Sequence, residues 1–127
     1  MYKKLIFGMI AFALVTVLFA ACSIKEAATS SGINARMGAS NFIDTKVTLK
    51  KGQSVTLVDE VASLHTITNG QWVGSQAKAA VEPGAPQVHF SISNAGATQN
   101  VGPFTTAGTF YLYCTIHPGM NLEVIVQ

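Results

Sequence analysis

The segment from Tyr113 to Met120 holds three side chains that bind soft metals. It reads Tyr-Cys-Thr-Ile-His-Pro-Gly-Met, so a thiol, an imidazole and a thioether follow one another as Cys114, His117 and Met120. A thiolate, an imidazole and a weak thioether form the ligand set that suits copper in an electron-transfer site. Such a site needs a second imidazole, and His65, in the run Ser-Leu-His-Thr-Ile, is the candidate.

The residues before the thiol alternate as in a strand, which we predict over residues 109–114. Phe110, Leu112 and Cys114 then share one face, so the thiol points into the core wherever the other two do. Tyr113 lies on the opposite face, and we expect its side chain to be partly exposed. The Pro-Gly turn that follows can bring His117 and Met120 back over the sulfur.

Beyond residue 41 the apolar residues recur with a period close to two, and helical spacing is not sustained. Short β-branched and aromatic runs between Gly, Pro and Asn are typical of an antiparallel β-sandwich or barrel. Two long segments, 69–87 and 93–106, are predicted to be irregular, and loops of this length are functional or mobile. The predicted strands are Lys46–Leu49, Ser54–Val58, Leu64–Thr68, Val88–Ile92, Thr109–Cys114 and Leu122–Val126.

The segment 113–120 resembles the copper loop of the cupredoxins, the small blue-copper proteins, and its Cys-x-x-His-x-x-Met spacing resembles that of amicyanin. The run Leu-His-Thr-Ile-Thr at 64–68 resembles the first-histidine segment of that family. The run Ala-Gly-Thr-Phe at 107–110 resembles the entry into its cysteine strand. The resemblance covers roughly residues 41–127. It implies an all-β, Greek-key β-sandwich of about seven or eight strands.

The resemblance also implies a role for each candidate ligand. His65, Cys114 and His117 would form a trigonal plane around one copper ion, with Met120 as the long axial ligand. His117 would be the ligand nearest to solvent and the port for the electron. Thr66 stands where many cupredoxins have Asn, so the bracing of the site differs from theirs. The implied function is that of a plastocyanin-like or amicyanin-like, single-copper electron carrier and not of an enzyme.

Each of these residues has a plainer interpretation when it is taken alone. Cys114 would then be a small buried hydrophobic residue, and His65 a structural histidine. His89 alternates with apolar neighbours and is expected to face solvent, outside any metal site. Trp72 is expected to pack within its long loop. Tyr113, which is bonded through the chain to a copper ligand, could offer a second electron route.

Composition and residue counts exclude several other classes of protein. The formal charge is +2, and Lys3 and Lys4 account for both units, so no basic surface is available to bind nucleic acid. With 49% hydrophobic and 11% charged residues, the chain is not disordered. A catalytic Cys–His pair needs an orienting group beside the base, and the short spacing with a nearby methionine suits a metal better. Structural zinc typically takes four strong nitrogen or sulfur ligands, and this set offers only three. A multicopper oxidase needs more than the three histidines present.

The N-terminal segment begins Met-Tyr-Lys-Lys and continues as an uncharged apolar run over residues 5–21. A basic start, an apolar middle and small residues at the end are typical of a secretory signal, predicted here over residues 1–21. The run ends in Phe-Ala-Ala before Cys22, which resembles the lipobox of bacterial lipoproteins and implies that Cys22 carries the lipid. A plain signal peptide and an uncleaved anchor are the alternatives. With Cys22 acylated and Cys114 bound to copper, neither cysteine is left for a disulfide.

Residues 22–40 are rich in Ala, Ser and Gly and predict a flexible tether ahead of a folded domain over residues 41–127. A first strand could begin inside this tether, near Ile33 to Met37, and the sequence leaves that open. The chain is then expected to be a monomer that is lipid-anchored to the membrane on its extracytoplasmic side, in the periplasm or at the cell surface.

The expected partners are redox proteins of the cell envelope: a cytochrome, an oxidase or another copper protein. The near-zero charge after residue 21 predicts weak binding through a small apolar patch, without strong steering. A copper carrier or sensor that uses the same ligands without a redox role is the main alternative. An adhesion or structural lipoprotein on the same scaffold, with idle ligands, is the other.

Overall fold

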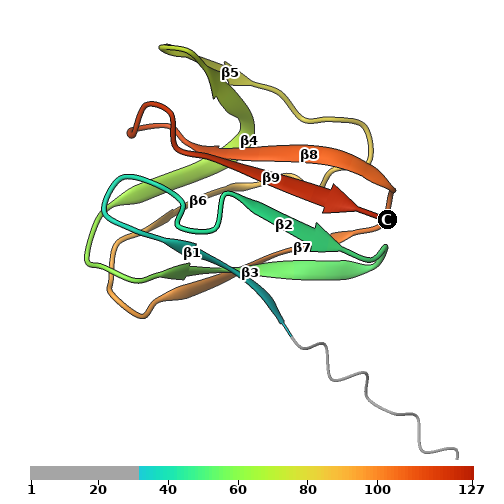
Figure 1. The fold of residues 1–127 in the computed structure, drawn as a ribbon, viewed down its shortest axis with the longest axis horizontal. Helices are drawn as coiled ribbons and strands as arrows, with labels where there is room; N and C mark the ends of the chain where they lie inside the picture. Colours follow the sequence, from blue (N-terminus) through green and yellow to red (C-terminus); the bar gives the residue numbers. More distant parts are fainter. Residues whose placement is uncertain (1–31) are drawn as a thin grey trace, which may run out of the picture.

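The computed structural model describes residues 32–127, which form nine strands and no helix (Figure 1). The described part therefore holds no helix that is long and apolar enough to cross a membrane. In chain order the strands are β1 (Ile33–Met37), β2 (Lys46–Leu49), β3 (Gln53–Asp59), β4 (His65–Val73), β5 (Gln76–Ala79), β6 (His89–Ile92), β7 (Thr98–Phe104), β8 (Gly108–Cys114) and β9 (Asn121–Val126).

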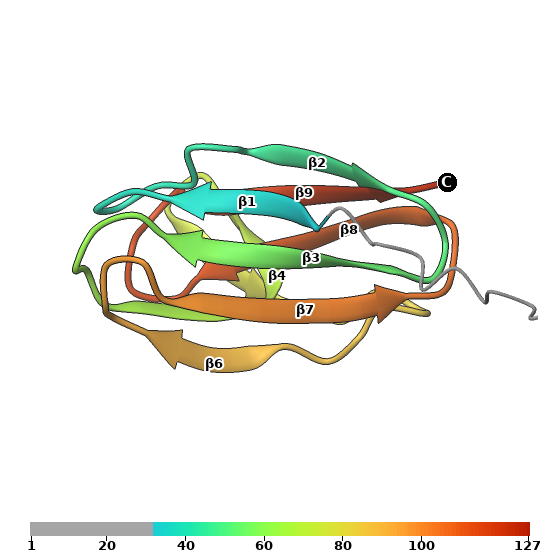
Figure 2. The same ribbon diagram turned by 90° about the horizontal axis from the view of Figure 1, so that it is seen from below.

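The strands build two sheets around one core. The smaller sheet has the order β1-β3-β7, and the larger has the order β2-β9-β8-β4-β5, with β6 beside the first half of β4. Figure 2 shows β1, β3 and β7 side by side. The pairs β1–β3 and β2–β9 are parallel, and the other pairs are antiparallel. The predicted all-β sandwich is confirmed, and most of its strand pairs are antiparallel as expected, with β1–β3 and β2–β9 as the parallel exceptions.

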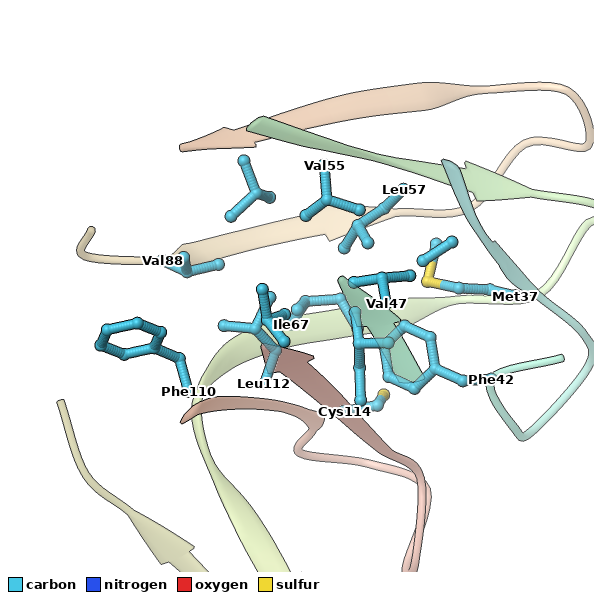
Figure 3. Packing of buried hydrophobic residues seen from close by; sticks show 14 of the residues in the cluster. Met37, Phe42, Val47, Val55, Leu57, Ile67, Val88, Phe110, Leu112 and Cys114 are labelled. Carbon is cyan, nitrogen blue, oxygen red and sulfur yellow. The ribbon is translucent and has the colours of Figure 1, made fainter. Parts of the chain in front are cut away.

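Alternating side chains fill the space between the sheets, because successive residues of a strand point to opposite faces. Val55 and Leu57 of the smaller sheet belong to one buried cluster with Phe110, Leu112 and Cys114 of the larger sheet (Figure 3). The last three share one face of β8, as the sequence predicted. Burying side chains of this size contributes roughly 1.5–3 kcal/mol each, so this cluster is the main source of stability.

All six predicted strands are present, but the two segments predicted to be irregular were assigned wrongly. Within 69–87, β4 continues to Val73 and pairs with β5 as a hairpin. Within 93–106, the strand β7 pairs with β3. β5 is exposed along its whole length, and β7 buries only Val101 and Phe104. Neither strand therefore shows the apolar alternation by which a strand is recognised.

The strand β1 lies inside the segment that the sequence assigned to a tether. It pairs with β3 in parallel, and Ala35 and Met37 are fully buried in the core. Residues 33–37 therefore belong to the folded part, which begins before residue 41. The predicted signal over 1–21 and the lipid site at Cys22 lie outside the described residues and stay predictions.

Candidate metal centre

Three side chains that could bind a metal meet at one end of the sandwich. His65, Cys114 and His117 each offer a ligand atom, and these atoms all lie within 4.8 Å of one another. The sulfur of Cys114 lies 3.4 Å from Nδ1 of His117, and the two imidazole centroids are 5.0 Å apart. The residues that the sequence singled out from distant parts of the chain are thus brought together. It is the one such group in residues 32–127.

Strand pairing fixes the two buried members of this group. His65 is the first residue of β4 and pairs with Ile92 of β6. Cys114 is the last residue of β8 and pairs with Ile67 of β4. Both side chains are completely buried, and Cys114 is a free thiol. Because both residues sit at ends of neighbouring strands, their positions depend on backbone hydrogen bonds and not on flexible side chains.

The loop after β8 is closed on itself by its backbone. The Cys114 amide donates to the Met120 carbonyl at 3.0 Å, and the Met120 amide donates to the His117 carbonyl at 3.1 Å. The Thr115 amide donates to the carbonyl of Thr66 at 2.9 Å, which ties the loop to β4. Met120 is buried at this turn, with 1% of its surface exposed. Thr66 therefore braces the loop through its backbone, where the resemblance implies a side chain.

Burial sets the protonation of the first histidine. Burial lowers the pKa of His65 and the nearby His117 lowers it further, while the negative charge of Asp59 and the Gly38 backbone oppose these effects. A histidine that stays neutral near pH 7 keeps a ring lone pair free for a metal. His117 is only half-buried, so it is the member of the group with access to solvent.

Sequence reasoning missed one residue of this region, Asp59. Its carboxylate is fully buried, and Oδ1 lies 3.8 Å from Nε2 of His65. The signal was present in the alternation of β3, where Val55, Leu57 and Asp59 occupy successive inward positions. A carboxylate in register with two core residues is unusual, because burying a charge is costly unless it is paired.

Trp72 and Tyr113 lie on the outer face of the cysteine strand and differ from expectation. Trp72 is part of β4, and its indole Nε1–H donates to the Cys114 carbonyl at 2.8 Å. Its ring meets the ring of Tyr113 edge-on, with centroids 6.0 Å apart. Tyr113 is only 4% exposed, so the prediction of partial exposure was wrong. The hairpin formed by β4 and β5 explains this, because it adds the tryptophan at that face.

The remaining sequence candidates fall where their pattern indicated. His89 is exposed, pairs with Thr68, and is not part of the metal-binding group. Ile116 and Leu64, which precede His117 and His65 in the chain, are exposed apolar side chains, with 47% and 52% of their surface accessible. The exposed Pro118 and Gly119 complete the loop.

Comparison with known proteins identifies the fold. Neither a protein family model nor a curated protein sequence matches this chain. Among solved structures, amicyanin from Paracoccus versutus matches at 20% identity over 77% of this chain and 83% of that chain, with a TM-score of 0.56. A reduced proline-to-phenylalanine amicyanin mutant matches at 23% identity over 76% and 83%, with a TM-score of 0.56.

A third match is the reduced Cu(I) form, at pH 4, of a proline-to-glycine mutant of amicyanin. It has 24% identity over 76% of this chain and 83% of that chain, with a TM-score of 0.55. At these identities the matches establish the architecture. The chain has the cupredoxin fold, and among cupredoxins it is similar to amicyanin, as the sequence predicted.

Proposed function

We propose that this chain is a single-copper electron-transfer protein of the blue-copper type. His65, Cys114 and His117 would hold the ion, and the thioether of Met120 would be a fourth, weaker ligand. The observation that carries this proposal is the convergence of one thiol and two imidazoles within 4.8 Å, at the end of a sandwich with the fold of amicyanin.

The donor set fits copper better than the other common metals. One thiolate with two imidazoles in a plane and a weak thioether is the blue-copper arrangement, whereas structural zinc takes four strong nitrogen or sulfur ligands. When bound, the copper supplies one-electron redox chemistry. The buried strand ends and the closed loop hold the ligands in place, which favours a site that changes little between oxidation states. No substrate has to be transformed, so the proposal includes no enzymatic activity.

His117 is the proposed electron port, because it is half-buried, whereas His65, Cys114 and Met120 are buried. The exposed apolar side chains of Ile116 and Leu64 lie on neighbouring segments and suit a weakly binding redox partner. A second route through Tyr113 remains part of the proposal. Because Tyr113 is covered, that route would need Trp72, which is half-buried and hydrogen-bonded to the Cys114 carbonyl, as its outer member.

The cellular setting is proposed from the sequence. The apolar N-terminal run and Cys22 support export and lipid anchoring at the outer face of the membrane. The partners would then be a cytochrome, an oxidase or another copper protein of the cell envelope.

The test is the visible absorption spectrum of the full chain during titration with Cu(II). We expect an intense thiolate-to-copper charge-transfer band that saturates at one equivalent, is absent from Cys114→Ser, and is unchanged in His89→Gln, whose histidine is exposed and outside the group. The band should disappear on reduction and return on oxidation. A chain that stays colourless would contradict the proposal and favour an idle scaffold. Loss of copper during redox cycling would favour a copper carrier or sensor instead.

A further inference from the structure

We propose that Asp59 is a positioning residue for His65: its carboxylate accepts the Nε2–H of the imidazole, aims Nδ1 at the metal and stabilises the oxidised site. This inference rests on the proposed function, because it concerns the same ion.

The first support is the isolation of these two side chains. Both oxygens of Asp59 and both ring nitrogens of His65 are buried and lack a hydrogen-bond partner among the described residues. Both side chains have no exposed surface. A buried polar group without a partner costs about 1–3 kcal/mol, and more when it is charged. Two such residues that face each other therefore indicate that their polar atoms interact with a group that is not part of the chain. A metal ion bound to the other nitrogen of the imidazole would be such a group.

The second support is the rigidity of the backbone on either side of the gap. The Asp59 amide donates to the Ala97 carbonyl at 2.9 Å, and its carbonyl accepts from the Gly96 amide at 2.6 Å. On its other side Asp59 pairs with Met37 of β1. His65 is held by its pairing with Ile92. The fold therefore fixes the two backbones at these positions, with both side chains completely buried.

The third support is the orientation of the ring. Nε2 of His65 is the nitrogen that lies 3.8 Å from Oδ1 of Asp59, which leaves Nδ1 for the group that contains Cys114 and His117. Histidines that bind metals almost always donate their other ring N–H to a carboxylate, a carbonyl or water, and this bond fixes the tautomer. The 3.8 Å separation is longer than a hydrogen bond, and we expect it to shorten when the ion binds.

The charge of the Asp59 carboxylate should affect the two oxidation states of copper differently, which a neutral acceptor would not do. A buried negative charge attracts a doubly charged ion more strongly than a singly charged one, and the interaction is stronger in the interior than in water. Asp59 should therefore raise the affinity for Cu(II) more than the affinity for Cu(I) and so lower the reduction potential. The Gly38 backbone also raises the pKa of His65, although it forms no hydrogen bond to the ring in the structure, and it is the competing acceptor.

The test compares Asp59→Asn with Glu60→Gln in the full chain. Both variants remove one negative charge from adjacent positions, but Glu60 is exposed. The amide oxygen of Asn can still accept the Nε2–H, but it carries no charge. We expect Asp59→Asn to lower the affinity for Cu(II) about 10-fold, the lower end of the loss typical when the outer partner of a metal ligand is changed. The affinity for Cu(I) should fall less, and the reduction potential should rise. Glu60→Gln should change neither affinity.

Two further readouts separate positioning from a structural role. In the diamagnetic Cu(I) form, the Nε2 proton of His65 should exchange slowly with water. Its nuclear magnetic resonance signal should shift in Asp59→Asn. The unfolding temperature should fall more in the copper-loaded variant than in the metal-free one. Equal falls in both forms, or copper affinities that match those of Glu60→Gln, would overturn the inference and favour Gly38 as the acceptor. A parent chain without a charge-transfer band would instead refute the proposed function, and this inference with it.

Discussion

The apolar centre of the sandwich and its metal-binding end are buried to the same extent, but they bury different kinds of side chain. In the centre, Leu57 and Leu112 are completely buried among other apolar side chains. At the metal-binding end, His65 and Asp59 are buried just as completely, yet their polar atoms have no hydrogen-bond partners. Four of the five unpartnered buried side-chain atoms in residues 32–127 belong to these two residues. The centre supplies stability, whereas the metal-binding end buries polar groups without partners, which lowers the stability of the fold.

The largest expected effect on the free energy of unfolding comes from a cavity made in the apolar centre. Leu112→Ala should lower the free energy of unfolding by about 3 kcal/mol, because it removes a fully buried side chain from a packed core. The charge-transfer band of the copper form should keep its position. Chemical denaturation measures the first quantity and absorption the second. Leu64→Ala, at a half-exposed side chain, is the control and should change stability by less than about 0.5 kcal/mol.

Copper itself should stabilise the metal-binding end. An ion that binds only the folded chain adds about 2.7 kcal/mol to the free energy of unfolding when its free concentration is one hundred times Kd. Thermal unfolding with and without Cu(II) measures this gain, which should disappear in Cys114→Ser. If that variant were stabilised by copper as much as the parent, the ion would be bound elsewhere, and the contrast between the two regions would fail.

A smaller effect is expected on the outer face of the cysteine strand, where Trp72 donates a hydrogen bond to the Cys114 carbonyl. Trp72→Phe should cost roughly 1–2 kcal/mol, the sum of one hydrogen bond and a modest loss of packing. It should also shift the charge-transfer band, because the ligand residue loses a donor. Tyr111→Phe, at a half-buried position of the cysteine strand β8, is the matched control. A band that moves equally in both variants would show that Trp72 has no special influence on the thiolate.

The smallest effect lies on the outer surface, where Arg36 binds Asp44 through two side-chain hydrogen bonds of 2.8 and 2.9 Å. The hydrogen bond from Arg36 lowers the pKa of Asp44 from 3.8 to about 2. An acid whose pKa is lowered by folding stabilises the folded state at pH values above its pKa in the unfolded chain. This contribution is lost as the pH falls through its pKa in the folded chain, about 2. Asp44→Asn should therefore cost less than about 1 kcal/mol at pH 7, since the pair is exposed to solvent. Denaturation at several pH values should show the difference shrinking below pH 4 and vanishing near pH 2. A difference independent of pH would show that the charge is irrelevant.

The sequence predicted those parts of the fold in which chemistry and periodicity agree. The alternation of Phe110, Leu112 and Cys114 gave the direction of the thiol correctly, because one face of β8 is buried. The strands β5 and β7 were missed, since edge strands with exposed side chains carry little apolar pattern. Parallel pairing of β1 with β3 depends on contacts between segments distant in sequence, which no local pattern contains.

The candidate site shows the same division. The close spacing of Cys114, His117 and Met120 made the loop recognisable, and His65 followed from the need for a second imidazole. Asp59 was not recognised, because its importance arises only when β3 and the start of β4 lie together. The burial of Tyr113 was also missed, since it depends on a hairpin that the sequence did not reveal.

The direction of β1 determines how the molecule would stand on a surface. Met37, at the end of β1, pairs with Asp59 beside the first histidine, whereas Ile33 pairs with Val55 farther from it. The described chain thus enters about 13 Å from Met37, given the usual rise per residue of a strand. An anchor attached upstream of Gly32 would join the domain at the end of β1 that lies away from the ligand-bearing loop. That loop would then stay accessible to partners on the aqueous side.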